Sequence, residues 1–284
     1  MEPNINNLVS VIIPCYNDHA YIEEAIGSVN NQTYKNVEII VIDDGSGTET
    51  KEILKNIKQE NLTVLYQENA GPSTARNNGI IHAKGDFILT LDADDYFDAT
   101  FVEKGMLVFE KESDVGLVTC NAYVFNENGI IDEIISKEGD VIHFFLNNSA
   151  IGNSLFRKES WSAIGGFDED MKKGFEDWDF HIGLTKANWK IKVIEEYLFY
   201  YRDKPNSRNS QADKLFKYDL WKYIYTKHKD LFLDNHELMI HTIFSQMEVL
   251  EKNCHTLRGS IDYKIGNKLL KPFRFIKNFG LKRK

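Results

Sequence analysis

The chain has 284 residues, of which 42% are hydrophobic and 27% charged, and its formal net charge is −9. This composition is that of a globular protein with one large domain or two modest ones, and an acidic body without a basic stripe argues against nucleic acid as a partner. No apolar run approaches the roughly 20 residues of a membrane-spanning helix, and the polar start MEPNINN is not a secretory signal. We therefore expect a cytoplasmic protein.

The cysteines Cys15, Cys120 and Cys254 are far apart and lack the paired spacing of a zinc or redox motif. We expect them to be buried or incidental thiols rather than disulfide partners.

The first hundred residues alternate apolar, β-branched runs with helical patterns. The apolar runs are nearly continuous, which is typical of strands covered by helices on both faces. Because crossovers between parallel strands are right-handed, this alternation predicts a doubly wound, Rossmann-like, mostly parallel α/β sheet. The predicted strands are 9–14, 37–42, 62–66 and 86–91, and the predicted helices are 19–31, 48–59 and 72–83, the last with Pro72 in its first turn.

The second half of the chain changes character. Residues 116–136 predict two antiparallel strands joined by a turn at 126–129, followed by a helix. Residues 175–189 predict an amphipathic helix with acidic residues in its first turn, where the helix dipole favours them. From about residue 211 the pattern is helical to the end. We expect a main domain over 1–205, with halves 1–98 and 99–205, and a helical C-terminal region over 206–284.

Ligands of such sheets bind beyond the carboxyl ends of the strands. The turn after the first strand, PCYNDHA, has no glycine, so a dinucleotide fingerprint is absent. Asp44 ends the second strand, where a carboxylate can accept a hydrogen bond from a ribose hydroxyl or a base N–H; a turn or helix cap is the alternative role. Arg76, one turn into the third helix, can pair with a phosphate, with nearby acids or in an ordinary structural salt bridge.

The fourth strand runs into a crowd of carboxylates in LTLDADDYFD, formed by Asp92, Asp94, Asp95 and Asp98. Like charges this close are unfavourable unless a positive group lies among them. A few loop carboxylates suit Mg²⁺ or Mn²⁺, which keep several waters and take further oxygens from substrate phosphates. The alternative is that Asp94, Asp95 and Asp98 cap the following helix.

Five stretches in this order, SVIIPCYN, VIDDGSGT, NAGPSTARNNGI, GDFILTLDADD and GGFDEDMKKGFEDWDF, strongly resemble the family 2 glycosyltransferases of the GT-A fold. The resemblance covers residues 9 to about 205. It implies an inverting transferase that takes one sugar from a nucleoside diphosphate sugar, commonly a UDP-sugar, in the presence of Mn²⁺ or Mg²⁺.

Matched position by position, the resemblance implies that Asp177 is the catalytic base and that Glu176 contacts the acceptor or orients the base. Asp94, with Asp92, matches the metal-binding D-x-D. The residues that it implies for donor binding are Pro14, Tyr16, Asp44, Arg76, Asp92, Ala93 and Arg202.

Three further features bear on the reaction. Many relatives carry an Arg in the helix after the E-D pair, roughly where Gly183 stands in this chain. The Q-x-x-R-W motif of processive synthases is absent, and its absence favours the transfer of one sugar residue per binding event. A sugar nucleotidyltransferase would need a Gly-rich loop after the first strand, which PCYND does not provide. The non-enzymatic alternative is a sugar-nucleotide-binding or assembly protein whose site has decayed.

The last eighteen residues, 267–284, hold seven Lys or Arg and no acid, interleaved with Leu, Ile and Phe. Such a basic amphipathic tail can lie on an anionic membrane, where each basic group adds about 1 kcal/mol. The alternative is a helix end that packs its aromatic residues on the body. A membrane-bound tail fits an acceptor that is a lipid-linked saccharide or glycan at the inner face of the membrane, in surface polysaccharide biosynthesis.

Overall fold

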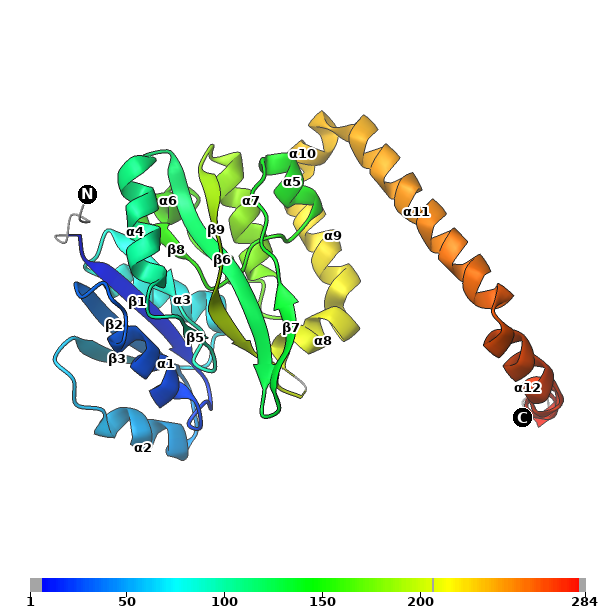
Figure 1. Ribbon diagram of the computed structural model, residues 1–284, viewed down its shortest axis with the longest axis horizontal. Helices are drawn as coiled ribbons and strands as arrows, with labels where there is room; N and C mark the ends of the chain where they lie inside the picture. The colour runs from blue at the N-terminus through cyan, green and yellow to red at the C-terminus, as the bar shows by residue number, and fades with distance from the viewer. Residues whose placement is uncertain (1–6, 206, 281–284) are drawn as a thin grey trace. The chain divides into compact units, whose positions relative to one another are not determined.

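The computed structural model describes residues 7–205 and 207–280. Within them, nine strands form one sheet in the order β3-β2-β1-β4-β8-β6-β9-β5, with β7 paired to β6 (Figure 1). The first four strands are parallel to one another, which confirms the predicted βαβ alternation. They are β1 Val9–Cys15, β2 Val37–Asp44, β3 Leu62–Gln67 and β4 Phe87–Thr90.

Helices cover both faces of this half of the sheet, as predicted. Val11 and Ile13 of β1 belong to a core that they share with α1, α2 and α4. Ile12, on the opposite face, meets α3, where a Cβ on Gly79 would come within 2.7 Å of the Ile12 side chain. Glycine at this position therefore lets α3 lie directly on the sheet. The bounds are α1 Ile22–Asn30, α2 Thr48–Asn56, α3 Pro72–His82 and α4 Phe101–Lys111.

The second half extends the sheet with antiparallel and parallel strands. β6 and β7 form the predicted hairpin, β8 is antiparallel to β4, and β9 runs parallel to β6. The strands are β5 Tyr96–Phe97, β6 Val115–Asn126, β7 Gly129–Ile134, β8 Leu155–Arg157 and β9 Lys190–Arg202. The helices are α5 Val141–Leu146, α6 Lys158–Ala163 and α7 Glu176–Lys186.

Two local expectations are wrong. Helix α7 is not amphipathic, because it packs against α5 and β9 and most of its side chains are buried, including the polar Glu176, Asp179 and His181. Asp98 does not cap α4. Its carboxylate instead accepts hydrogen bonds from the backbone and hydroxyl of Thr100, just before the helix begins.

The C-terminal part is helical, as predicted. Its elements are α8 Arg208–Gln211, a π-helix at Ala212–Phe216, α9 Lys217–Lys227, α10 Lys229–Asp234, α11 His236–Gly259 and α12 Ile261–Gly280. The chain divides into two compact units after Ile224. Residues 281–284, the end of the basic tail, lie outside the described residues.

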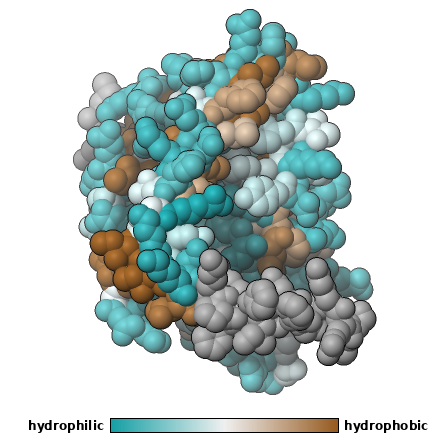
Figure 2. Space-filling model, turned by 90° about the vertical axis from the view of Figure 1, so that its right-hand side faces the viewer, coloured by the Kyte–Doolittle hydropathy of each residue, from teal (hydrophilic) through white to brown (hydrophobic). Residues whose placement is uncertain are grey.

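Among the described helices, none combines the length and the apolar character that crossing a bilayer requires. The surface nevertheless carries hydrophobic residues among hydrophilic ones (Figure 2). Many of these exposed hydrophobic residues belong to α11 and α12.

Candidate active site

A cavity of about 620 Å³ opens at the carboxyl ends of β1, β2 and β4. The strand order reverses here, since the chain proceeds outward from β1 to β3 and then returns to place β4 on the other side of β1. Such a switch point leaves a crevice in which open α/β sheets bind their ligands. Six of the residues predicted from the sequence line the cavity: Pro14, Tyr16, Asp44, Asp92, Ala93 and Asp94.

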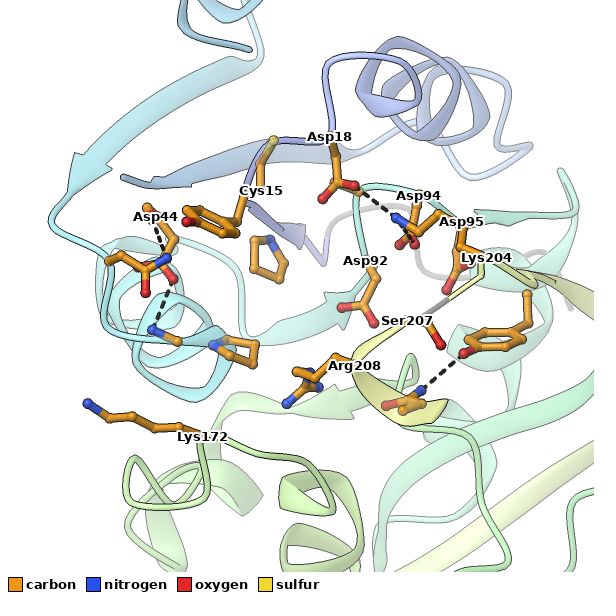
Figure 3. Close-up of a pocket in the computed structure, with 18 of the residues that line it drawn as sticks. Cys15, Asp18, Asp44, Asp92, Asp94, Asp95, Lys172, Lys204, Ser207 and Arg208 are labelled. Carbon is orange, nitrogen blue, oxygen red and sulfur yellow. Dashed lines mark hydrogen bonds and ion pairs between the residues drawn. The ribbon is translucent and has the colours of Figure 1, made fainter. Parts of the chain in front are cut away.

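Asp44 lies at one end of the cavity (Figure 3). Its Oδ1 accepts hydrogen bonds from the amide of Gln67, at 2.8 Å, and from the backbone N–H of Ala70, while its Oδ2 accepts from the N–H of Gly71 at 2.9 Å. The carboxylate therefore holds the turn that precedes α3. Each carboxylate oxygen offers about two acceptor positions, so Oδ2 keeps capacity for a ligand donor.

Asp92 is linked to Glu176 of α7 by ion pairs that both residues form with Arg76. Arg76 of α3 donates to Oδ1 of Asp92 at 2.7 Å and to Oε1 of Glu176 at 2.8 Å. Arg208, which lines the cavity, donates to both Glu176 oxygens, at 2.9 Å to Oε2. Of the roles that the sequence left open for Arg76, the structure shows a pairing with the acidic cluster.

Glu176 is buried between these two guanidinium groups and is not among the described residues that line the cavity. Burial by itself would raise the pKa of its carboxyl group, but the charges and hydrogen bonds of Arg208 and Arg76 lower that pKa to about 2. Glu176 is therefore ionised and fixes the position of both arginines.

Asp94 is paired with a lysine from the segment after β9. The ammonium of Lys204 lies 2.7 Å from Oδ2 of Asp94 and 3.0 Å from Oδ1 of Asp18, and all three residues line the cavity (Figure 3). Burial favours the neutral lysine, but the hydrogen bond and charge of Asp94, followed by those of Asp18, raise the pKa of Lys204 above its ordinary value. Burial and the charge of Asp92 raise the pKa of Asp94.

Positively charged side chains of the protein therefore lie within this cluster of carboxylates. From the sequence we expected a positive group there and assigned that role to a metal ion; the structure places Arg76 against Asp92 and Lys204 against Asp94. Asp95 is fully buried, and burial together with Asp94 and Asp92 raises its pKa well above the ordinary value. It accepts hydrogen bonds from the backbone of Arg202 and from Asn153.

Arg202, predicted to bind the donor, is not among the described residues that line the cavity. Its Nε donates to the backbone oxygen of Asp94 at 2.8 Å, and its guanidinium pairs with Glu24 and lies over the rings of Tyr21 and Phe125. In this structure Arg202 supports the loop that carries the acidic cluster. The neighbouring residues that line the cavity are Tyr201, Lys204, Pro205, Ser207, Arg208 and Asn209.

Asp177 lies at the start of α7 and is half-buried. It is not among the described residues that line the cavity. Its Oδ2 accepts a hydrogen bond from Nδ2 of Asn148 at 3.2 Å. Burial, and secondarily the charge of Glu176, raise its pKa, whereas the bond from Asn148 lowers it. Gly152 packs so closely that a Cβ there would lie 2.9 Å from the Cβ of Asp177.

Asn148 is in turn joined to a buried histidine. Nδ1 of His181 lies 3.4 Å from Oδ1 of Asn148, and burial lowers the pKa of His181 to about 3, so the ring is neutral. The neutral tautomer that carries its proton on Nδ1 can donate to Asn148. Asn148 thus links His181 to the carboxylate of Asp177.

Sequence reasoning missed four residues of this arrangement: Asp18, Asn148, Lys204 and Arg208. Lys204 and Arg208 lie within YYRDKPNSRNS, the stretch that contains the predicted donor-binding residue Arg202. No periodicity marks them, because their partners Asp18 and Glu176 are 186 and 32 residues away in the chain.

The side chains present fit a hard divalent cation. Among residues 7–205 and 207–280, no three His, Cys, Asp or Glu side chains gather as a complete metal-binding group. Asp92 and Asp94 nevertheless line the cavity, and one oxygen of each accepts no hydrogen bond from the described residues. Mg²⁺ and Mn²⁺ need only one or two carboxylates when waters and substrate phosphates complete the shell. Lys204, which contacts the other oxygen of Asp94, would repel such an ion.

The family model described as "Glycosyl transferase family 2" matches residues 10–175. An uncharacterized glycosyltransferase of Methanocaldococcus jannaschii, MJ1057, is 30% identical over an alignment of 226 residues, and the match covers 76% of this chain and 77% of the relative. A poly-beta-1,6-N-acetyl-D-glucosamine synthase of Staphylococcus aureus is 30% identical over an alignment of 182 residues, and the match covers 59% of this chain and 44% of the synthase.

Among solved structures, residues 1–349 of TarS from S. aureus, crystallised in complex with UDP-GlcNAc, superpose with a TM-score of 0.60 at 24% identity, covering 72% of this chain and 61% of that one. This likeness confirms the predicted GT-A fold. The chain spans less than half of the synthase and about three fifths of the TarS fragment. Together with the family match and the relative from M. jannaschii, the motifs at the strand ends establish that this chain is a glycosyltransferase belonging to family 2.

Proposed function

We propose that the protein is a metal-dependent, inverting glycosyltransferase that moves one sugar from a UDP-sugar to a hydroxyl group of a glycan or lipid-linked acceptor in surface polysaccharide biosynthesis. One observation carries this proposal: a cavity at the switch point of the sheet has Asp44 at one end and the Asp92 and Asp94 carboxylates at the other. A nucleoside diphosphate has its hydrogen-bonding base and its phosphates at opposite ends, in the same order.

The donor would lie along this cavity with its base and ribose near Asp44, Pro14 and Tyr16. Its diphosphate would then reach Asp92 and Asp94 on one side and the cationic Arg208 on the other (Figure 3). Guanidinium groups bind phosphate oxygens with strong, charge-assisted hydrogen bonds. A divalent ion held by Asp92 and Asp94 would supply Lewis-acid stabilisation of the charge on the leaving diphosphate.

Asp177 is the general base of the proposed reaction. In an inverting displacement, the acceptor oxygen bonds to the anomeric carbon as the bond from that carbon to the diphosphate oxygen breaks, and the acceptor proton passes to Asp177. The raised pKa of Asp177 suits this role, because a base works best when its pKa approaches the working pH. Asn148 and Gly152 hold the carboxylate in place.

Glu176 would act through the arginines rather than on the substrate. It is buried, and its two oxygens are occupied by Arg76 and Arg208. We therefore propose that it positions Arg208 at the cavity and Asp92 through Arg76, while Asp177, the next residue, faces the acceptor.

The relatives support the chemistry of donor and product. The synthase of S. aureus is named for a polymer of N-acetylglucosamine, and the TarS fragment was crystallised with UDP-GlcNAc. An N-acetylhexosamine or hexose carried on UDP is therefore the donor class that we propose. Absence of the Q-x-x-R-W motif from the sequence favours single transfer rather than polymerisation.

One observation favours a second candidate, a sugar-nucleotide-binding protein without catalytic activity. Lys204 lies against Asp94, where a metal ion would bind, and a decayed site could keep such a lysine permanently. The two candidates differ in whether Lys204 gives way to a metal when the donor binds.

Thermal unfolding with UDP tests the proposed function. We expect UDP to raise the melting temperature in the presence of Mn²⁺ or Mg²⁺ and to have little effect with EDTA, because a ligand stabilises the state that it binds. The matched control is Asp94→Asn, which should lose the metal-dependent part of the shift. Equal stabilisation in Mn²⁺ and EDTA would contradict the metal role, and a panel of UDP-sugars that shows no metal-dependent hydrolysis would favour the second candidate.

A further inference from the structure

Helix α11 carries apolar residues at alternating spacings of three and four. Together they form one stripe along a helix of 24 residues. An alternation of three and four residues has the 3.5-residue period of a coiled coil. The exposed apolar residues Leu238, Phe244 and Val249 of the same helix lie outside this stripe. We call this stripe the α11 seam; its residues are Ile240, Ile243, Met247, Leu250, Cys254 and Leu257.

The α11 seam is open to solvent. Its side chains are exposed, Leu250 by 63% and Leu257 by 65%, and Phe244 beside it is equally open. Burying a leucine contributes about 1.5–3 kcal/mol, so a continuous exposed row is costly unless another surface covers it.

Charge distinguishes this helix from the basic tail and argues against a membrane as the occupant. Helix α11 contains Lys252 and Arg258 but also Glu237, Glu248 and Glu251. It therefore has no net positive charge to attract an anionic bilayer, whereas a helix that lies on membranes has a polar face rich in Lys and Arg. A protein surface with the same apolar stripe fits it better.

We propose that the α11 seam binds the α11 seam of a second copy of this chain, as a parallel, two-stranded coiled coil. In heptad terms, Ile240, Met247 and Cys254 are at a positions and Ile243, Leu250 and Leu257 are at d. Leucine at d with a β-branched residue at a favours two parallel strands; Leu250, Leu257 and Ile240 follow that rule, and Ile243 at d does not.

The flanking residues are compatible with the parallel arrangement. In a parallel pair, each g position faces the e position five residues further along the partner. This places Gln246 opposite Glu251 and Asn253 opposite Arg258 of the second copy. Neither pair joins like charges. The helix spans more than three heptads, about 36 Å, which is long enough for a specific pairing.

A parallel pair would bring the two basic tails to the same end of the coiled coil, because α12 follows α11 directly in each copy. Two linked weak sites bind a surface more tightly than either alone. The dimer would in this way strengthen any contact of residues 267–284 with an anionic membrane, although the pairing itself does not depend on that contact or on the proposed reaction.

Two adjacent positions allow a matched test of the seam. Leu250 lies in the seam and Val249 lies one residue outside it, and both are exposed, by 63% and 57%. We expect the full chain to be a dimer at micromolar concentration in analytical ultracentrifugation. Leu250→Lys should raise the dissociation constant at least about a hundredfold, since one leucine is lost from each copy, while Val249→Lys should leave the dimer intact.

Cys254 reports the direction of the strands. It is the one exposed cysteine among those described, since Cys15 and Cys120 are buried. In a parallel pair in register the two Cys254 residues face each other, within the Cα separation of about 7 Å that a disulfide allows. The oxidant diamide, which takes up the two protons and two electrons, should then link two chains, and Cys254→Ser should abolish the link.

Each result of these experiments either supports or overturns the proposed coiled coil. A dimer that Leu250→Lys dissociates, Val249→Lys preserves and diamide links through Cys254 supports the proposal. A chain that is monomeric at these concentrations overturns it, as does a dimer that survives Leu250→Lys. A dimer without a Cys254 link overturns the parallel arrangement. None of these results depends on UDP or a metal, so they leave the proposed function to its own test.

Discussion

Lys204 holds the carboxylate of Asp94 from a distance of 2.7 Å, and the same ammonium contacts Asp18 at 3.0 Å. A protein cation therefore lies between two of the carboxylates that line the cavity. Because an ammonium group and a divalent ion beside one carboxylate repel each other, Lys204 opposes the binding of a metal at Asp94.

We predict that Lys204→Gln strengthens Mn²⁺ binding to the donor-free protein. Removing the competing charge should lower the dissociation constant by about tenfold, as expected for the loss of one nearby like-charge interaction in a partly exposed site. Titration calorimetry with Mn²⁺ alone measures this. Lys204→Arg, which keeps the charge, is the control, and unchanged affinity in Lys204→Gln would show that Lys204 does not oppose the metal.

Asp177→Asn should bind donor normally and fail in transfer. An amide cannot accept the acceptor proton as a carboxylate does, so we expect the turnover number to fall by about 10²–10⁴-fold with little change in UDP affinity. Transfer assays and UDP titrations measure the two quantities. Asp170→Asn, an exposed acidic residue seven positions earlier, is the control. Undiminished turnover would remove Asp177 as the base.

Asn148→Ala should shift the acidic limb of the pH–rate profile to higher pH. The hydrogen bond from Asn148 lowers the pKa of Asp177, which burial and Glu176 already raise. Losing that bond raises the pKa of Asp177 further, so a higher pH is needed to deprotonate the base. The profile of kcat/KM reports this pKa in the free enzyme. A merely structural role for Asn148 would lower the rate at every pH without moving the limb.

Glu176 should make stability depend on pH in the acidic range. Its pKa is lowered from an ordinary value of about 4.5 to about 2 on folding. The folded state is therefore favoured above pH 4.5, and this stabilisation, about 3 kcal/mol, is lost as the pH falls from 4.5 through 2. Urea unfolding at a series of pH values measures it.

The variant Glu176→Gln gives the matching result. It leaves Arg76 and Arg208 without their shared carboxylate, which costs about 3–5 kcal/mol for a broken buried pair. It should also remove the Glu176 contribution to the pH dependence below 4.5. A variant as stable as the natural chain would mean that water or Asp92 already compensates both arginines.

Deleting residues 267–284 should reduce binding to vesicles that contain anionic lipid. This segment holds seven basic residues and no acid, and each contributes about 1 kcal/mol near such a surface. Flotation with anionic and with neutral vesicles, at low and high salt, measures the effect. Equal flotation of the full and shortened chains would leave the segment with a packing role.

The parts of the site that the sequence revealed are those fixed by regular geometry. Apolar runs predicted four parallel strands, and parallel strands bring their carboxyl ends to one edge. Asp44 and Asp92 therefore had to lie near one cavity, as they do. The E-D pair likewise had to stand at the start of its helix, and α7 begins at Glu176.

The burial of α7 was not predicted from the sequence. Its alternation of acidic and apolar residues is typical of a surface helix, but α5 and β9 enclose it. Glu176 consequently became a buried anion that needs two arginines, and no local pattern distinguishes a buried acidic turn from an exposed one. Only the packing of neighbouring elements decides between them.

The sequence by itself determined the succession of strands and helices over residues 9–91 and the acidic residues at the carboxyl ends of those strands, because each is a pattern or a motif within one short segment. Tertiary structure alone decided which cations meet those acids. Lys204 meets Asp18 from 186 residues away, and Arg76 meets Glu176 across 100 residues. Such pairs depend on where a later segment of the chain crosses the sheet. A single ion pair between distant residues creates no repeating pattern in the sequence, so the sequence does not predict it.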